Sequence, residues 1–350
     1  MFNNYFKFPL DKETPLLNNV VVDSYIKVNS LTILYQNMAN EPLFLNTDEA
    51  ATMLNVHPNT ILRWIKSGKL PSSKIGSQYR IPREAIENRV SRAGSGTRII
   101  AVANQKGGVA KTTTVVNLAA GLGRTGKKVL VVDLDPQGGC AVSLGIATDS
   151  LNKTVYTVLI NDDVTFEDII IETSQHFDLA PSNIDLAGAE VELKQFLAAE
   201  QILKRKLRDV VDSYDFILLD CPPSLGMLTI NAFTAAGELL IPMSMELLAL
   251  RGLDMLAKTV SKIRAITNSD LTYLGVLATK YDKRTLNSQE IFVALQKASR
   301  NAGIKMFDTY ITSSVRFTES PNLKAPLILI DPEHEGSKAY AQIVEEIING

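Results

Sequence analysis

The chain has 350 residues, which is enough for two or three domains. Its hydrophobic share is 45% and its net charge is −2, so a membrane-embedded chain and a globally basic nucleic-acid binder are both excluded. With two cysteines, Cys140 and Cys221, neither a disulfide framework nor a cysteine metal site is expected, and a reducing compartment is favoured. No apolar run reaches the roughly 18 residues of a membrane span, and the N-terminus lacks a signal-peptide pattern. We therefore expect a cytoplasmic protein with no membrane partner.

Residues 1–44 are rich in asparagine and carry no motif. We expect a partly ordered arm or a dimer contact there, with its role unknown.

Residues 45–92 predict a helix, a tight turn, a second helix, a hairpin and a third helix. Thr47 is the expected N-cap of the first helix, and Gly68 is expected to close the second. Trp64 is expected in the core of this module. The segment carries eight basic and four acidic residues, a net charge of +4, which on a helix-turn-helix pattern indicates DNA binding. The residues expected to face DNA, on the second helix and the basic hairpin, are Thr60, Arg63, Lys66, Lys74 and Arg80.

Residues 93–97 form a Ser/Gly-rich linker, and an α/β pattern runs from 98 to 350. Short, almost wholly apolar runs predict buried parallel strands: "RIIAVAN", "KVLVVDLD", "FILLD", "ELLIPMS" and "YLGVLATK". Longer helical patterns lie between them. The expected fold is therefore a mostly parallel sheet flanked by helices, preceded by a small winged helix-turn-helix domain.

The first of these strands leads into "QKGGVAKTTTVVNLAAGL", a loop followed by a helix. Glycines allow the backbone to approach an anion, and the helix N-terminus favours negative charge. A lysine in this place neutralises β- and γ-phosphates, and the next hydroxyl ligates Mg²⁺. The loop predicts a P-loop site for ATP and Mg²⁺, and its nucleotide-binding residues are Lys106, Gly107, Gly108, Val109, Ala110, Lys111, Thr112 and Thr113.

Three aspartates come at the ends of two predicted strands: Asp133 and Asp135 after one, Asp220 after the other. Ligands bind at the carboxyl ends of strands in an open parallel sheet. We expect one of these carboxylates to orient water or contact the shell of the metal, and another to hold the loop.

Ala110 stands where such loops usually have glycine. If the backbone there needs a positive φ, alanine costs about 1–2 kcal/mol relative to glycine; if it is near helical, alanine costs nothing. We expect function to be retained with slow turnover.

Together, "KGGVAKTTT", "VDLDPQGG" and "LLDCPPSLGMLTINAFTAA" resemble the deviant Walker A ATPases of the ParA/Soj/MinD superfamily, and the resemblance is strongest to the ParA/Soj branch. It covers roughly residues 97–350. It implies that Lys106 reaches across an ATP-bound homodimer to the phosphates of the partner, so that Lys106, Lys111 and Asp135 are catalytic. It also implies that Asp133 and Asp220, with Thr112, act around Mg²⁺.

The same resemblance implies non-specific DNA binding through Arg284 and Arg316, and hydrolysis stimulated by a ParB-like partner. It implies association with the nucleoid. The front module resembles the excisionase/MerR type of winged helix, which suggests binding of a specific operator for autoregulation. The leading hypothesis is a plasmid or chromosome partition ATPase.

One alternative remains open. The chain could be a transcriptional regulator whose P-loop domain senses nucleotide with little or no hydrolysis. A MinD-like membrane ATPase is rejected because "AYAQIVEEIING" is acidic, whereas a membrane-targeting helix would be basic and amphipathic.

Overall fold

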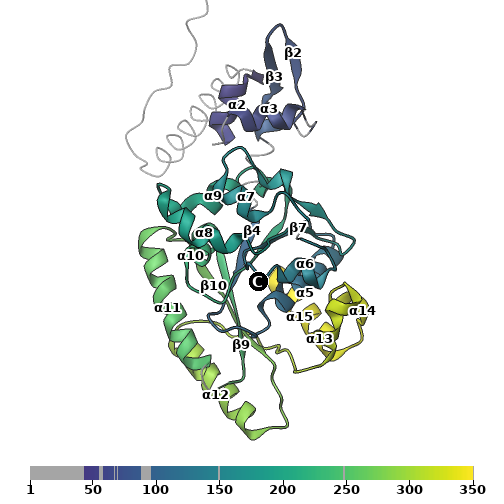
Figure 1. Ribbon diagram of the computed structural model, residues 1–350, viewed down its shortest axis with the longest axis vertical. Coiled ribbons are helices and arrows are strands. Elements are labelled where there is room, and N and C mark those ends of the chain that lie inside the picture. The colour runs from purple at the N-terminus through teal and green to yellow at the C-terminus, as the bar shows by residue number, and fades with distance from the viewer. Residues whose placement is uncertain are drawn as a thin grey trace, which may run out of the picture. The chain divides into compact units, whose positions relative to one another are not determined.

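The computed structural model describes residues 43–54, 58–66, 68, 70–87, 96–148, 150–246 and 249–349. The expected arm at 1–44 lies almost wholly outside these residues, as does most of the linker. The chain divides into two compact units, 1–88 and 89–350 (Figure 1). Among the described residues, no helix is both long and apolar enough to cross a bilayer.

In the front unit, helices α2 (Thr47–Leu54) and α3 (Pro58–Lys66) pack on a small antiparallel sheet. The sheet has the order β1-β3-β2, with strands β1 (Phe44–Leu45), β2 (Ser73–Ile75) and β3 (Gln78–Pro82), and residues 83–87 are helical. Trp64 is 1% exposed in the core of this unit, as expected. The predicted order of helix, helix, hairpin and helix is confirmed, and strand β1 is an addition that the sequence pattern did not indicate.

The cap of α2 is Asn46, so the expected Thr47 cap is wrong. The Asn46 side chain accepts hydrogen bonds from the backbone N–H groups of Asp48 and Glu49, both at 2.9 Å. Glu49 in turn accepts from the Asn46 N–H at 2.8 Å. This reciprocal pair is a capping box, shifted by one residue from the expected position.

Thr60 is buried, at 6% exposed, so its expected place on the open face of α3 is wrong. Thr60 shares the inward face of α3 with Ile61, its neighbour in the chain, and Trp64, one helical turn further on. Lys66 is exposed and Arg63 is half-buried. On the hairpin, Lys74 and Arg80 are both exposed.

The large unit contains a seven-stranded sheet of order β10-β9-β4-β8-β5-β7-β6 (Figure 1). Every pairing is parallel except that of the edge strand β6 with β7. The strands are β4 (Arg98–Val102), β5 (Val129–Asp133), β6 (Ile171–Glu172), β7 (Asp178–Ala180), β8 (Phe216–Asp220), β9 (Glu238–Ser244) and β10 (Thr272–Thr279). The five predicted strands are therefore confirmed. The mostly parallel sheet is confirmed as well.

Helices cover both faces of this sheet. One face carries α7 (Val155–Ile160), α8 (Leu186–Glu192), α9 (Ile202–Leu207), α10 (Met227–Ala235), α11 (Ala249–Ile266) and α12 (Leu286–Asn301). The other carries α5 (Lys111–Arg124), α6 (Gly139–Ser143), α14 (Leu327–Ile330) and α15 (Glu335–Asn349), and the short α13 (Arg316–Glu319) precedes α14. Successive residues of a central strand enter opposite cores, since side chains alternate along a strand: in β4, Ala101 packs on the first face and Ile100 and Val102 on the second.

Helix α5, which follows the predicted phosphate loop, is held against α15 at close range. A Cβ at Gly121 would lie 2.8 Å from a methyl group of Val344, so only glycine fits there. The buried Thr114 and Tyr340 hydroxyls are 3.1 Å apart. Asn117 accepts a hydrogen bond from the Ile328 N–H at 3.0 Å. These contacts fix the N-terminus of α5 relative to the sheet.

Candidate nucleotide site

The loop between β4 and α5 has the backbone of an anion-binding turn. Gly108 has a φ of 72°, and Val109 is buried beneath the loop. Among the described residues, nothing lies within 4 Å of a Cβ built at Gly107 or at Gly108, so the described part of the chain leaves both glycines open. Helix α5 begins at Lys111, so its first N–H groups face the loop. The geometry suits a phosphate chain.

Ala110 adopts the left-handed conformation, with φ 67° and ψ 34°, at the N-cap of α5. The first of the two alternatives for this position therefore holds, and alanine is strained there relative to glycine. The loop keeps its conformation although it lacks the expected glycine, because the residues on either side are fixed.

Two buried side chains fix the loop, and the sequence analysis did not identify either. Asn104 donates to the Pro242 carbonyl oxygen at 2.7 Å and accepts from the Lys106 N–H at 3.0 Å. Thr279, at the end of β10, donates to the Val109 carbonyl oxygen at 3.0 Å. Both tie the loop to neighbouring strands. Asn104 lies two residues after the end of β4 and was readable as a polar residue next to a buried strand. Thr279 lies 170 residues after Val109 in the chain and gave no local signal.

Lys111 is 7% exposed and lies beneath the loop. Its ammonium group donates to the Lys106 carbonyl oxygen at 3.4 Å. Burial lowers the pKa of Lys111, and the negative charge of Asp220 partly offsets this effect. A buried cation with one long hydrogen bond can accept further anionic oxygens, as a phosphate-binding lysine must.

Thr112 and Asp220 meet at the end of β8. The Thr112 hydroxyl donates to Asp220 Oδ2 at 2.6 Å. Asp220 is fully buried, and its other oxygen, Oδ1, has no hydrogen-bond partner. Burial raises the pKa of Asp220 to about 6, against the hydrogen bonds from Thr112 and Cys140. A hydroxyl and a carboxylate with a vacant oxygen are hard oxygen donors of the kind that Mg²⁺ prefers, so the donor set fits this ion.

Asp133 and Asp135 hold the neighbouring loop in different ways. Asp133 is fully buried and accepts from the N–H groups of Asp135 and Cys140, both at 3.0 Å. Burial raises the pKa of Asp133, and the nearby Asp220 raises it further. Asp135 is half-buried and accepts from the Gln137 N–H at 3.0 Å. Asp133 therefore shapes the turn, while Asp135 lies closer to solvent.

Lys106 points to the end of β9 and forms an ion pair with Glu246. The side chains of Lys106 and Glu246 are 31% and 57% exposed, so the pair lies at the rim of the site. Hydrogen bonding from Lys106 lowers the pKa of Glu246. Glu246 was not predicted as a site residue, since nothing in "PMSMELLAL" relates it to a lysine 140 residues earlier.

Arg284 lies between β10 and α12, and Arg316 is the first residue of α13. The segments that precede them meet where the Tyr281 N–H donates to the Ile311 carbonyl oxygen at 3.0 Å. Arg284 forms two hydrogen bonds with the Asp282 carboxylate, at 2.9 and 2.8 Å, although its side chain is 86% exposed. These bonds lower the pKa of Asp282 to about 2. Arg316 lies 3.4 Å from both Glu319 and Asp331. Both arginines are partly neutralised within the chain.

Residues 97–273 match the family described as AAA domain, and residues 44–93 match the family described as helix-turn-helix domain.

Among curated proteins, the sporulation initiation inhibitor protein Soj of Bacillus subtilis is 43% identical over 250 residues, which are 71% of this chain and 98% of Soj. The chromosome partitioning protein ParA of Caulobacter vibrioides is 36% identical over 258 residues, which are 72% of this chain and 94% of that protein.

Two solved structures extend the comparison. A Mycobacterium smegmatis protein named cobyrinic acid a,c-diamide synthase, with bound ADP and magnesium, is 38% identical at a TM-score of 0.64, over 72% of this chain and 94% of that one. The cell division ATPase MinD of Pyrococcus furiosus is 26% identical at a TM-score of 0.60, over 72% of this chain and 99% of that one.

Proposed function

Since the chain belongs to the ParA/Soj family of ATPases, we propose that it is a DNA-partition ATPase, which dimerises on ATP and Mg²⁺ and then binds DNA without sequence preference. The observation that carries the proposal is the convergence of Lys111, Thr112 and Asp220 beneath the phosphate loop. The domain bounds proposed with it are 45–92 for the DNA-binding front and 98–350 for the ATPase.

In this proposal each residue has a distinct task. The loop amides and Lys111 bind the phosphates, and Thr112 and Asp220 hold the metal, with Asp133 beside them. Bound Mg²⁺ supplies charge stabilisation for the transferring phosphoryl group. Asp135, the half-buried carboxylate, orients the attacking water. Alanine at position 110 is consistent with slow turnover.

Lys106 acts as the link between subunits. In the single chain it is held by Glu246, and in the ATP-bound dimer it would exchange this partner for the phosphates of the second subunit. A surface ion pair is worth at most about 1 kcal/mol, so a phosphate can displace Glu246 easily. Dimerisation then brings together Arg284 and Arg316 from two chains as a salt-sensitive DNA surface.

We further propose that a ParB-like partner stimulates hydrolysis and that the front unit binds an operator through Arg63, Lys66, Lys74 and Arg80. Exposure of the hairpin lysine and arginine supports this. Thr60 is left out because it is buried.

The alternative is a nucleotide-sensing transcriptional regulator with negligible hydrolysis. The strained Ala110 and the helix-turn-helix front favour it. This alternative predicts negligible ATP hydrolysis, and it predicts binding to a specific DNA site with no nucleotide-dependent binding to random DNA.

Light scattering with a non-hydrolysable ATP analogue and Mg²⁺ tests the proposal. The wild-type chain should become a dimer, and Lys106→Gln should bind the analogue but stay monomeric. Lys258→Gln is the matched control, because Lys258 also pairs with a surface carboxylate, Asp254, at 2.7 Å. A wild-type chain that binds the analogue and stays monomeric would contradict the proposed dimer switch.

A further inference from the structure

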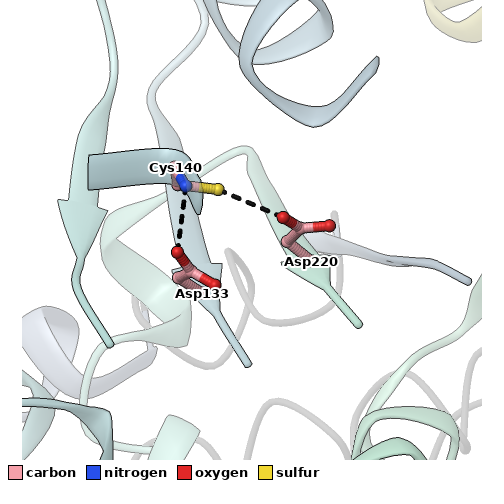
Figure 2. A group of neighbouring side chains, drawn as sticks. All are labelled: Asp133, Cys140 and Asp220. Atoms are coloured by element: carbon pink, nitrogen blue, oxygen red, sulfur yellow. Dashed lines mark hydrogen bonds between the residues drawn. The ribbon is translucent and has the colours of Figure 1, made fainter. Parts of the chain in front are cut away.

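A thiol lies among the carboxylates of the site. Cys140, at the start of α6, is 0% exposed, and its Sγ lies 3.4 Å from Asp220 Oδ2 (Figure 2). Its backbone N–H donates to Asp133. One ligand atom from each of Asp133, Cys140 and Asp220 lies within 4.8 Å of the other two.

These distances suit a small soft cation. Zinc binds thiolate sulfur at about 2.3 Å and carboxylate oxygen at about 2.0–2.2 Å, which for a tetrahedral ion places ligand atoms roughly 3.5 Å apart. The Cys140–Asp220 spacing already has this value. Asp133 can keep both backbone hydrogen bonds while it ligates, since each carboxylate oxygen has two lone pairs. To bind the same ion, the Asp133 carboxylate would have to move closer to Cys140 Sγ and Asp220, since the three ligand atoms now lie within 4.8 Å of one another.

A second feature concerns the other oxygen of the Asp220 carboxylate, which Figure 2 shows on the side turned away from Cys140. Asp220 Oδ1 is buried without a hydrogen-bond partner, although buried carboxylate oxygens are normally paired. Thr112 and Asp135, which contact Asp220 and Asp133, are half-buried, so the cluster lies close to the surface of the unit.

The sulfur changes which cation the cluster prefers. Mg²⁺ takes hard oxygen ligands and gains little from a thiol, whereas Zn²⁺ and Cd²⁺ bind thiolate strongly. Two carboxylates and a thiolate carry three negative charges, one more than a divalent cation balances, and they leave a fourth position for water. The thiol proton is released to solvent when the metal binds.

We propose that Asp133, Cys140 and Asp220 form a site for a soft divalent cation of the zinc type, which excludes Mg²⁺ from Asp220 and so opposes nucleotide binding. Metal binding itself does not depend on the proposed function; its opposition to the nucleotide rests on the role given to Asp220 and Thr112 there.

The test is a titration of the nucleotide-free full chain with Cd²⁺, followed by the ultraviolet charge-transfer absorption of the sulfur–cadmium bond. We expect one band per chain that saturates at one equivalent. Cys140→Ser should abolish it, with affinity reduced at least about 100-fold, the upper end of the loss seen for outer-shell changes. Cys221→Ser is the matched control: Cys221 is equally buried, but its Sγ contacts the Leu219 carbonyl oxygen at 3.8 Å.

Absence of the band in the wild-type chain would overturn the proposal, and so would its loss in Cys221→Ser. The wild-type titration stands by itself if Cys140→Ser fails to fold. Mg²⁺–ATP should lower Cd²⁺ affinity, and a band unchanged at saturating Mg²⁺–ATP would overturn the exclusion. A control measures ATP–Mg²⁺ binding in the absence of Cd²⁺. If ATP–Mg²⁺ binds and the cadmium band is still unchanged, the exclusion is overturned. If ATP–Mg²⁺ does not bind at all, the proposed function has failed, whereas the metal site stands as long as the band persists.

Discussion

Replacing Ala110, the N-cap residue of α5, by glycine should stabilise the protein. Ala110 has φ 67° and ψ 34°, where an L-residue costs about 1–2 kcal/mol relative to glycine. Glycine also makes the unfolded chain more flexible, which costs roughly 0.4–1 kcal/mol. The difference predicts a free energy of unfolding about 0.5–1 kcal/mol higher, and a melting temperature about 1–4 °C higher for a domain of this size.

The assay is thermal unfolding of the wild type and Ala110→Gly, followed by circular dichroism, with ATP affinity measured in parallel. Ala198→Gly is the matched control, since Ala198 is also a left-handed alanine, with φ 51° and ψ 46°, at the N-cap of a short helix far along the chain. Both variants should melt higher. ATP affinity should be unchanged in both, because the backbone at position 110 already has the conformation that glycine would adopt.

A lower melting temperature for Ala110→Gly, with a higher one for Ala198→Gly, would refute the reasoning. It would mean that the Ala110 methyl group makes a contact worth more than the strain of the left-handed backbone.

Three further predictions test separate parts of the molecule. Asp282→Asn should release Arg284 and strengthen ATP-dependent binding to random DNA. The slope of log affinity against log salt concentration should become steeper by about one. Fluorescence anisotropy at several salt concentrations measures both, and the control Asp254→Asn should change neither. Trp64→Ala removes the largest core side chain of the front unit and should cost it about 3–5 kcal/mol, so that calorimetry shows an early transition while the ATPase unit melts as before. Pairing with Arg284 lowers the pKa of Asp282 to about 2. The stability contributed by this pairing is therefore fully present above the ordinary pKa of an aspartate and is lost as the pH falls toward 2. A pH titration followed by NMR measures the pKa of Asp282, and a value near 4 would contradict the pairing.

The sequence reveals those parts of the site that are local in the chain. The phosphate loop and the strands on either side could be predicted because glycine, lysine and threonine follow an apolar run within a few residues. The ends of β5 and β8 were also readable, because a carboxylate directly follows each run. Strands β6 and β7, with two and three residues, are too short to give a periodic signal.

The parts that the sequence could not reveal depend on distant contacts or on single backbone angles. Thr279 and Glu246 reach the loop from strands far along the chain, and no motif marks them. Whether Ala110 is strained depends on one φ angle, which composition does not determine. Thr60 was misplaced because the buried face of α3 is centred on Ile61 and Trp64, which brings the neighbouring Thr60 inward.

The central claim is that nucleotide controls a DNA-binding dimer. Titration of the full chain against random-sequence duplex DNA, with ATP and Mg²⁺, with ADP and without nucleotide, at low and physiological salt, tests it most directly. The account predicts tight, salt-sensitive binding with ATP and weak binding otherwise. Binding that is the same in all three nucleotide states would contradict it and favour the transcriptional regulator.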